Sequence, residues 1–344
     1  MLENKAIRLL GSSTFFDACG ERIKALASDA NRIIEPVLAP AHPSDSLTAS
    51  ALSTIDIAFY SRDIWLGSTM SVPSPASKAF FSTVDAAPNL HWLHVTSAGS
   101  DLAVYRPTLA RGICLTTSSG ASAKPIAQTA VAAILAQSRA FPHWLAAQAQ
   151  RNWAPLSGSQ IPKSLDEQTA LIVGLGPIGQ EIGRLLHTVG LRTVGVRRSI
   201  EAMPFFDSVH SYSELSSLLG QCDWLVLACP LTPETCDLID AQRISLLPLG
   251  ASIVNVSRGE LLDEKALLSA LRNGQLAGAY LDVFRTEPLP QDSELWDTPN
   301  VWITPHNSAT SSGYQERIIE IFIGNLANWI NKKPLANQVK LNVA

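Results

Sequence analysis

Residues 169–179 read TALIVGLGPIG. Its apolar first half has the composition of a buried strand, a G-x-G-x-x-G turn follows directly, and a helical pattern begins after the last glycine. In this setting Gly174 allows a tight turn, Gly176 lets the backbone approach a pyrophosphate, and Gly179 lets helix and strand pack closely. The stretch therefore predicts a dinucleotide-binding unit, with phosphates at the helix N-terminus, in preference to an ordinary strand-to-helix turn.

The composition indicates a globular protein with a sizeable core. Of the 344 residues, 46% are hydrophobic and 16% are charged. A chain of this length suggests two domains. The net charge of −4 argues against nucleic acid or an anionic membrane as a partner. Five scattered cysteines without a C-x-x-C pair argue against a disulfide framework or a metal site. Because we find neither a membrane-spanning apolar run nor a signal-peptide pattern, we expect a cytoplasmic protein.

The first 120 or so residues alternate between strand and helix patterns. Helices are predicted over residues 18–27 and 76–85, and residues 39–53 have the composition of a loop with a short helix. Strands are predicted at residues 6–10, 33–38, 55–60, 90–95 and 113–117. This alternation favours a parallel sheet that helices cover on both faces.

A second alternating series contains the glycine-rich turn. Long helical patterns at residues 121–139 and from Trp144 precede it, and a helix over 311–330 and an extended tail over 334–339 close the chain. Strands are predicted at residues 170–173, 192–196, 224–227, 252–256, 277–281 and 301–303. The predicted fold class is α/β, with two Rossmann-like or flavodoxin-like parallel-sheet domains.

The residues after the second strand of this series bear on cofactor choice. An NAD site usually places an Asp or Glu there for the ribose 2′-hydroxyl, whereas this chain has Arg197, Arg198 and Ser199. Guanidinium groups pair well with a 2′-phosphate. We therefore expect NADP(H) to be preferred, with NAD(H) possible; the alternative is two solvated surface arginines.

Arg258, Glu287 and His306 each follow a predicted strand of the same series, so one sheet edge should gather them. An arginine can bind a carboxylate and polarise the adjacent carbonyl. A histidine can supply a proton as hydride reaches the carbon, and a glutamate on its other ring nitrogen favours the imidazolium. Each residue singly has an ordinary structural explanation, but the set suits reduction of a 2-oxo acid.

Five segments together resemble the D-isomer-specific 2-hydroxyacid dehydrogenase family over nearly the whole chain. They are GLGPIG at 174–179, CPLTPET at 229–235, NVSRGELLD at 255–263, DVFRTEP at 282–288 and TPH at 304–306. The resemblance implies that Arg258 binds the substrate carboxylate, that His306 is the acid/base and that Glu287 is its partner. It also implies that the N–H groups of Ala98 and Gly99 hold the carboxylate, which puts the active site in a cleft between the domains.

The resemblance implies cofactor contacts as well. Pro177 and Ile178 would lie at the pyrophosphate, and Cys229 and Pro230 beneath the adenosine. The residues expected to bind cofactor are Gly174, Gly176, Pro177, Ile178, Gly179, Arg197, Arg198, Ser199, Cys229, Pro230, Thr235, Val256, Ser257, Arg258, Asp282, His306 and Ser308.

The family's first domain is discontinuous, so we assign 1–121 plus 311–344 to the substrate domain and 122–310 to the NAD(P)-binding Rossmann domain. Family members are usually dimers, and we expect a homodimer. Arg62, just past a first-domain strand, is a candidate substrate contact, with a surface ion pair as the alternative.

Two departures from the family pattern matter. Arg197 replaces the usual acidic residue, as in the NADPH-linked glyoxylate and hydroxypyruvate reductases that the chain looks like. Asn307-Ser308-Ala309 follows His306 where a small apolar residue and Ala-Gly are usual, which leaves the substrate open.

The function we predict is reduction of a small 2-oxo acid, such as glyoxylate or hydroxypyruvate, to the D-2-hydroxy acid by NADPH. One alternative is a non-enzymatic NAD(P)-sensing interaction protein, like the corepressors that resemble these dehydrogenases. Another is a related two-domain NAD(P) enzyme that acts on formate, phosphite or an amino acid.

Overall fold

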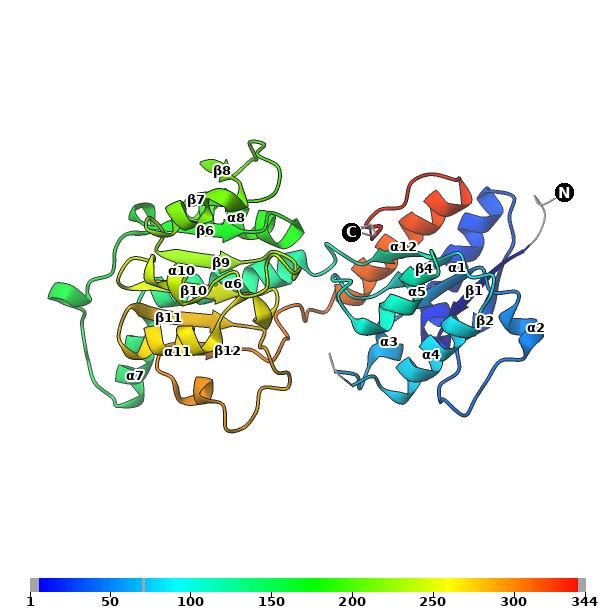
Figure 1. Cartoon of the computed structure of the whole chain (residues 1–344), viewed down its shortest axis with the longest axis horizontal. Coiled ribbons are helices and arrows are strands. Elements are labelled where there is room, and N and C mark those ends of the chain that lie inside the picture. Colours follow the sequence, from blue (N-terminus) through cyan, green and yellow to red (C-terminus); the bar gives the residue numbers. More distant parts are fainter. Residues whose placement is uncertain (1–5, 70–71, 340–344) are drawn as a thin grey trace. The chain divides into compact units, whose positions relative to one another are not determined.

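The computed structural model describes residues 6–69 and 72–339. The chain divides into two compact units, drawn in Figure 1. Unit 1 contains the residues up to Ala121 and those from Ser312 onward, and unit 2 runs from Ser122 to Ser311. The sequence-based assignment changes domain at 121/122 and 310/311.

Unit 1 is built on a five-stranded parallel sheet in the order β2-β1-β3-β4-β5. Its strands are β1 (Ile7–Gly11), β2 (Ile34–Leu38), β3 (Ile57–Tyr60), β4 (Trp92–Val95) and β5 (Cys114–Thr117). This is the flavodoxin-like order, in which the winding direction reverses between β1 and β3. Pro36 lies in edge strand β2, opposite Leu9, where a missing N–H breaks no internal ladder.

Helices cover both faces of this sheet. On one face, α1 (Ser13–Asp29) and α12 (Tyr314–Ile330) lie side by side, joined by ion pairs from Arg22 to Glu316 and Glu320. Phe322 of α12 stacks on Phe59 with ring centroids 4.6 Å apart, which ties the C-terminal helix to the N-terminal sheet. The other helices of unit 1 are α2 (Ala49–Leu52), α3 (Arg62–Trp65), α4 (Pro75–Ala86), α5 (Arg106–Ala110) and the 3₁₀ turn η1 (Ala103–Tyr105).

The C-terminal tail pairs with strand β5. The N–H of Thr117 donates to the carbonyl of Asn337 (3.1 Å), and the N–H of Val339 donates to the carbonyl of Leu115 (2.9 Å). Thr116 and Gln338 form an antiparallel bridge between them. The tail thus occupies the free edge of the unit 1 sheet.

Unit 2 contains a seven-stranded parallel sheet in the order β12-β11-β10-β9-β6-β7-β8. Its strands are β6 (Thr169–Val173), β7 (Arg192–Val196), β8 (Ser208–His210), β9 (Trp224–Leu227), β10 (Ala251–Asn255), β11 (Leu276–Leu281) and β12 (Val301–Ile303). The winding direction reverses between β6 and β9, so the loops after β6, β7 and β9 border the crevice where such folds bind dinucleotides.

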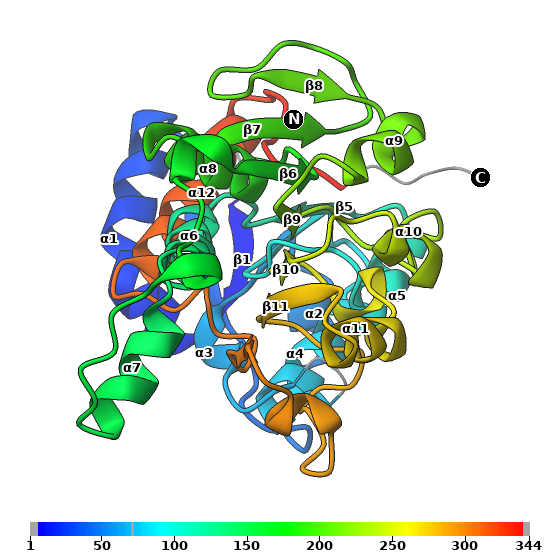
Figure 2. The ribbon, with the colours of Figure 1, turned by 90° about the vertical axis from the view of Figure 1, so that its left-hand side faces the viewer.

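Successive residues of β6 face opposite layers of helices. Ala170 and Ile172 belong to the core with α6 (Ala123–Ser138) and α8 (Pro177–Thr188), whereas Leu171 and Val173 belong to the core with the other layer. That layer contains α9 (Leu215–Leu219), α10 (Ala241–Ser245) and α11 (Glu264–Arg272), and Figure 2 shows the two layers on either side of the strands. Short 3₁₀ turns are η2 (Gly158–Gln160), η3 (Leu165–Glu167), η4 (Tyr212–Glu214), η5 (Gly259–Leu261) and η6 (Glu294–Asp297).

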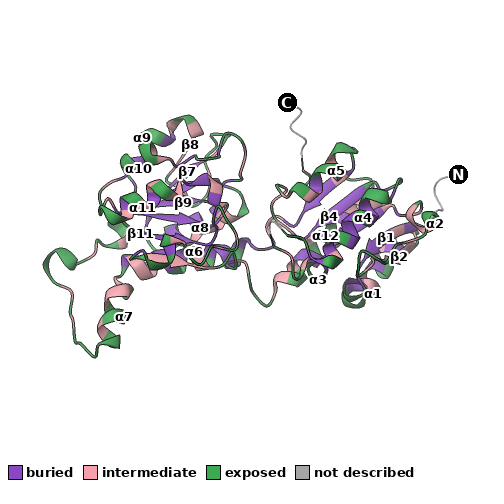
Figure 3. Cartoon of the chain, turned by 60° about the horizontal axis from the view of Figure 1, so that its bottom comes forward, coloured by how far each residue is buried: buried purple, intermediate pink, exposed green. Residues whose placement is uncertain are grey.

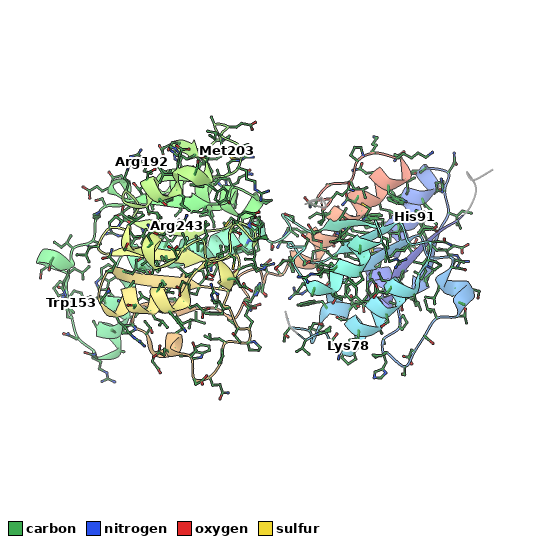
Figure 4. The ribbon with its side chains drawn as sticks, in the orientation of Figure 1. Lys78, His91, Trp153, Arg192, Met203 and Arg243 are labelled. Carbon is green, nitrogen blue, oxygen red and sulfur yellow. The ribbon has the colours of Figure 1, made fainter. Side chains whose placement is uncertain are left out.

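Helix α7 (Phe141–Ala149) buries none of its nine residues, a property that it shares only with the four-residue α2 among the α-helices of the described residues. Figure 3 shows α7 and the segment after it as exposed or intermediate, standing off the body of unit 2. Trp153 in that segment is 95% exposed and lies away from the sheet in Figure 4.

The predicted fold class is confirmed, but several element boundaries are wrong. Helix α1 begins at Ser13, not residue 18, because the Ser12 hydroxyl accepts from the N–H of Phe15 and caps it. The closing helix begins at Tyr314 instead of 311, α6 begins at Ala123 instead of 121, and α7 begins before Trp144. Helices α3 and α5 and strand β8 were not predicted, because three to five residues carry too little periodicity.

Candidate active site

The glycine-rich turn joins β6 to α8 and leaves room for a ligand. Gly174 has φ +97°, and a Cβ there would come within 2.4 Å of the Cys229 backbone. A Cβ at Gly179 would lie 1.9 Å from the Gly174 carbonyl oxygen. Gly176, by contrast, has no atom within 4 Å of its Cβ position, and no side chain caps α8. The turn therefore offers open space in front of a helix N-terminus, and Pro177 and Ile178 are its first residues.

The three residues after β7 differ in how far they are exposed. Arg197 is half-buried, and its Nη1 contacts the Met203 sulfur at 3.1 Å. Arg198 and Ser199 are exposed. The pKa of Glu234 is lowered by a hydrogen bond with Thr232, by its own backbone N–H and, to a lesser extent, by the charge of Arg198. The charge of Arg198 therefore acts on Glu234 in the loop after β9.

The loop after β9 is held by its own side chains. Cys229 is fully buried, and its carbonyl accepts from the hydroxyl of Ser257. The Thr235 hydroxyl donates to the Pro230 carbonyl (2.8 Å) and accepts from the Thr232 N–H (2.7 Å). Thr235 and Ser257, both expected to contact cofactor, use their hydroxyls to shape this loop.

Asn255 organises the loop after β10. Its side chain accepts from the Ser257 N–H (3.1 Å) and donates to the Arg258 carbonyl (2.8 Å), so it closes a turn around Val256. Arg258 itself is half-buried, and its Nη1 donates to the Ser257 carbonyl at 2.7 Å. The guanidinium is thereby held beside its own loop.

Gly259 brings this loop against the next one. A Cβ at Gly259 would stand 2.0 Å from the Phe284 carbonyl carbon and 2.2 Å from the Arg285 nitrogen. Only glycine permits so close an approach of the two backbones. Arg258 and Glu287 therefore come from loops in direct contact.

Glu287 accepts hydrogen bonds from two loops. Its Oε1 accepts from the Phe284 N–H (3.0 Å), and its Oε2 lies 2.7 Å from His306 Nδ1. Burial raises the pKa of Glu287, but the hydrogen bond and charge of His306, the Phe284 N–H and the charge of Arg258 together bring it below its ordinary value. The 2.7 Å contact joins Glu287 to His306, and the charge of Arg258 makes a smaller contribution to lowering the pKa of Glu287.

Asp282 holds the loop that carries His306. Its buried carboxylate accepts from the Thr304 hydroxyl (2.5 Å), from the N–H groups of Asn307 (2.9 Å) and Ser308 (3.1 Å), and from the Ser308 hydroxyl. His306 adopts φ +50°, and its N–H donates to the Asp282 carbonyl (2.8 Å). Asp282 and Ser308, expected as cofactor contacts, thus direct most of their hydrogen bonds to the His306 loop.

The substrate-binding candidates of unit 1 lie at the carboxyl edge of its sheet. Among the described residues, nothing accepts from the N–H groups of Ala98 and Gly99, which follow β4. Arg62 is exposed after β3, with its guanidinium carbon 5.0 Å from the centroid of the Tyr314 ring. The expected alternative, a surface ion pair, is not what the structure shows, because no carboxylate in the described part of the chain pairs with Arg62.

Three contributors were missed at the level of sequence. Tyr314 supports Arg62, Gly259 sets the contact between two loops, and Arg285 binds across them. Gly259 and Arg285 lie inside quoted motifs, but a motif does not reveal which distant backbone its residues meet. Among the residues that the structure describes, no cluster of three or more His, Cys, Asp or Glu side chains is arranged to hold a metal ion. No helix in the described ranges is long and apolar enough to cross a membrane.

Comparison with known proteins places this geometry in context. Residues 131–308 match the profile of the D-isomer specific 2-hydroxyacid dehydrogenase NAD-binding domain. The chain is 32% identical over 257 residues to glyoxylate/hydroxypyruvate reductase HPR3 of Arabidopsis thaliana, which covers 74% of this chain and 78% of that protein.

Solved structures match over almost the whole chain. A D-isomer specific 2-hydroxyacid dehydrogenase from Xanthobacter autotrophicus, in complex with NADPH and MES, is 26% identical with a TM-score of 0.76, covering 97% of this chain and 98% of that one. A family protein from Aeromonas salmonicida is 30% identical with a TM-score of 0.75, covering 98% and 99%.

Replacing Glu287 with glutamine tests how strongly the site holds this carboxylate. Because folding lowers the pKa of Glu287 below its ordinary value of 4.5, the ionised carboxylate stabilises the folded state. That contribution is fully present above pH 4.5 and is lost as the pH falls through the lowered pKa. Urea denaturation at several pH values should show a difference in unfolding free energy between wild type and Glu287→Gln that shrinks in acid. A difference that stays constant far below that pH would contradict the assignment.

Proposed function

The chain belongs to the D-isomer-specific 2-hydroxyacid dehydrogenase family of oxidoreductases, and on that premise we propose that it reduces a small 2-oxo acid of the glyoxylate or hydroxypyruvate type to the D-2-hydroxy acid with NADPH. The 2.7 Å contact between Glu287 and His306, with the Arg258 charge beside it, carries the proposal. It pairs an acid/base group with its carboxylate partner at the edge where the sheet presents its glycine-rich turn.

The residues of unit 2 fit a dinucleotide. The space at Gly176, the uncapped N-terminus of α8 and the exposed Arg198 match a pyrophosphate and a 2′-phosphate in charge and room. Gly174, Pro177, Ile178 and the loop after β9 would hold the group. When bound, NADPH supplies the hydride.

The side chains then have separate tasks. Arg258 binds the substrate carboxylate and polarises the 2-oxo group, so the carbonyl oxygen can accept negative charge. His306 donates a proton to that oxygen. Glu287 accepts from Nδ1, which orients the ring and stabilises its protonated form. In unit 1, the N–H groups of Ala98 and Gly99, which find no acceptor among the described residues, are suited to a carboxylate, and Arg62 is suited to a further polar group of the substrate.

A panel of glyoxylate, hydroxypyruvate and pyruvate, with NADPH oxidation followed by absorbance, tests the reaction. We expect turnover by the wild type. His306→Ala and Arg258→Ala should retain NADPH binding but lose at least about a hundredfold in kcat/KM, because each removes a group that acts on the reacting carbonyl. NADPH binding without turnover of any panel member would overturn the proposal and favour the cofactor-sensing alternative. Near-normal turnover by either variant would overturn its assigned role.

Cofactor preference depends on Arg198 in this proposal. Arg198→Ala should raise the KM for NADPH about tenfold or more and leave that for NADH unchanged, because a charged hydrogen bond contributes about 1.5–3 kcal/mol. Arg192→Ala is the matched control, since Arg192 is an exposed arginine at the other end of β7 (Figure 4). Equal kcat/KM of the wild type with NADH and NADPH would contradict an NADP(H) preference.

We further propose a homodimer that uses α7. None of its nine residues is Asp, Glu, Lys or Arg, and Trp144 and Leu145 are 41% and 56% exposed. An uncharged, apolar helix that buries nothing within its own chain is typical of a subunit interface. Trp153, which follows α7 in the chain, is also exposed and extends this apolar patch. The partner we propose is a second copy of the chain, which presents the same uncharged face.

Sedimentation velocity tests the dimer directly. The wild type should sediment as a dimer, and Leu145→Glu should shift it toward monomer by burying a charge in the interface. Leu249→Glu, at an 80%-exposed leucine elsewhere in unit 2, should have no effect. A wild type that is monomeric at all concentrations would remove the proposal.

A further inference from the structure

Arg285 makes contacts that the catalytic roles above do not use. Its guanidinium forms an ion pair with Asp237 and donates from Nε to the Leu262 carbonyl (3.2 Å) and from Nη2 to the Glu260 carbonyl (3.4 Å). Its backbone N–H donates to Glu264 Oε1 at 2.8 Å. These partners belong to the segments that follow β9 and β10, whereas Arg285 itself follows β11.

The three segments are those that carry the candidate site. The β9 loop contains Cys229 and Pro230, and its residue Asp237 also donates its N–H to the Glu260 carbonyl (2.8 Å). The β10 loop contains Arg258. The β11 loop contains Glu287, whose carboxylate accepts from the N–H of Phe284, the neighbour of Arg285 in the chain.

An ordinary surface ion pair does not account for this arrangement. Such a pair contributes about 0–1 kcal/mol and holds only its two side chains. Arg285 instead uses its fork and its backbone on four partners, at the point where Gly259 brings two backbones into contact. Burial raises the pKa of Glu264, the Arg285 N–H lowers it, and the charges of Glu260 and Asp263 raise it further. The Arg285 guanidinium thus binds the Asp237 carboxylate, while the Arg285 backbone N–H binds the Glu264 carboxylate.

We propose that Arg285 is a positioning residue, which fixes the Arg258 loop and the Glu287 loop against each other so that Glu287 stays on His306. The role rests on the proposed reductase function, because it acts through the groups assigned there. The partners of Arg285 given above are Asp237, Glu260, Leu262 and Glu264, none of which has a proposed part in the chemistry. Arg285 affects the placement of Glu287 and Arg258. Replacing it removes no group that has a proposed role in the reaction.

The test compares Arg285→Met with Arg285→Lys and with a control, Arg272→Met. Arg272, the last residue of α11, lies in the same unit and pairs at 3.0 Å with Glu294 at the start of η6. Arg285→Met should lower kcat about tenfold while the KM for NADPH stays within about twofold, because the chemistry depends on placement and cofactor binding does not. Arg285→Lys should recover only part of kcat, since it keeps the ion pair with Asp237 but lacks the fork. Arg272→Met should be unchanged.

The pH profile separates positioning from general destabilisation. Burial raises the pKa of Glu287, but His306, the Phe284 N–H and the charge of Arg258 together hold it below its ordinary value, and a displaced Glu287 loses part of that effect. The acid limb of kcat/KM should therefore move to higher pH in Arg285→Met, a shift that mere loss of stability does not cause. The charged groups on the loops around the His306 ring in unit 2 are Glu287, Arg258 and Asp282. Glu287 and Asp282 lie on the β11 loop with Arg285, and Arg258 lies on the β10 loop that Arg285 contacts.

Two further measurements keep the outcome decisive. If Arg285→Met folds poorly, Asp237→Asn is the alternative variant, and it should show a smaller loss of kcat because it removes only the ion pair. Amide hydrogen exchange over residues 258–262 and 284–287 should be faster in Arg285→Met than in Arg272→Met, whether or not a substrate is known. An active wild type whose Arg285→Met variant keeps kcat, pH profile and exchange would overturn the positioning role alone. A wild type inactive on the whole panel would overturn the proposed function, and unchanged exchange in that case would overturn the positioning role as well.

Discussion

Parallel strands all end at the same edge of their sheet, and the candidate site of unit 2 depends on this constraint. Residues separated by up to 132 positions, from Gly174 to His306, reach one edge because each lies on a loop that follows a parallel strand. The edge brings the loops together, but it does not set side chains at bonding distance. That last step is taken by contacts between loops, among them the 2.7 Å contact between Glu287 and His306, the two residues proposed to form the acid/base pair.

The loops differ in how they are fixed. Asn255 and Thr235 close turns within their own loops, whereas Asp282 holds the following loop through four hydrogen bonds. Gly259 works by having no side chain at all. Buried polar groups that are fully paired are costly to disturb. A substitution at Asp282 would therefore change the position of His306, although the hydrogen bonds of the Asp282 carboxylate go to Thr304, Asn307 and Ser308.

The sequence predicted most of the strands, because short apolar runs such as residues 170–173 are typical of a sheet interior. It also led to Arg258, Glu287 and His306 as candidates, because each follows such a run within a few residues, and their catalytic roles remain predictions. It was insufficient for β8, whose three residues are polar in part, and for α3 and α5, which are single turns. The roles of Gly259, Arg285 and Tyr314 depend on contacts with residues distant along the chain, and no local pattern encodes those.

The two outer strands of the unit 1 sheet are shielded in different ways. At β2, Pro36 lacks the N–H that an incoming strand would require, and at β5 the chain's own residues 337–339 already occupy the hydrogen-bonding groups. Exposed sheet borders are templates for intermolecular strand addition, the first step of aggregation into extended β-structure. A chain truncated before Asn337 would lose the residues that cover the edge of β5. An affinity tag is therefore better attached beyond the tail than in place of it.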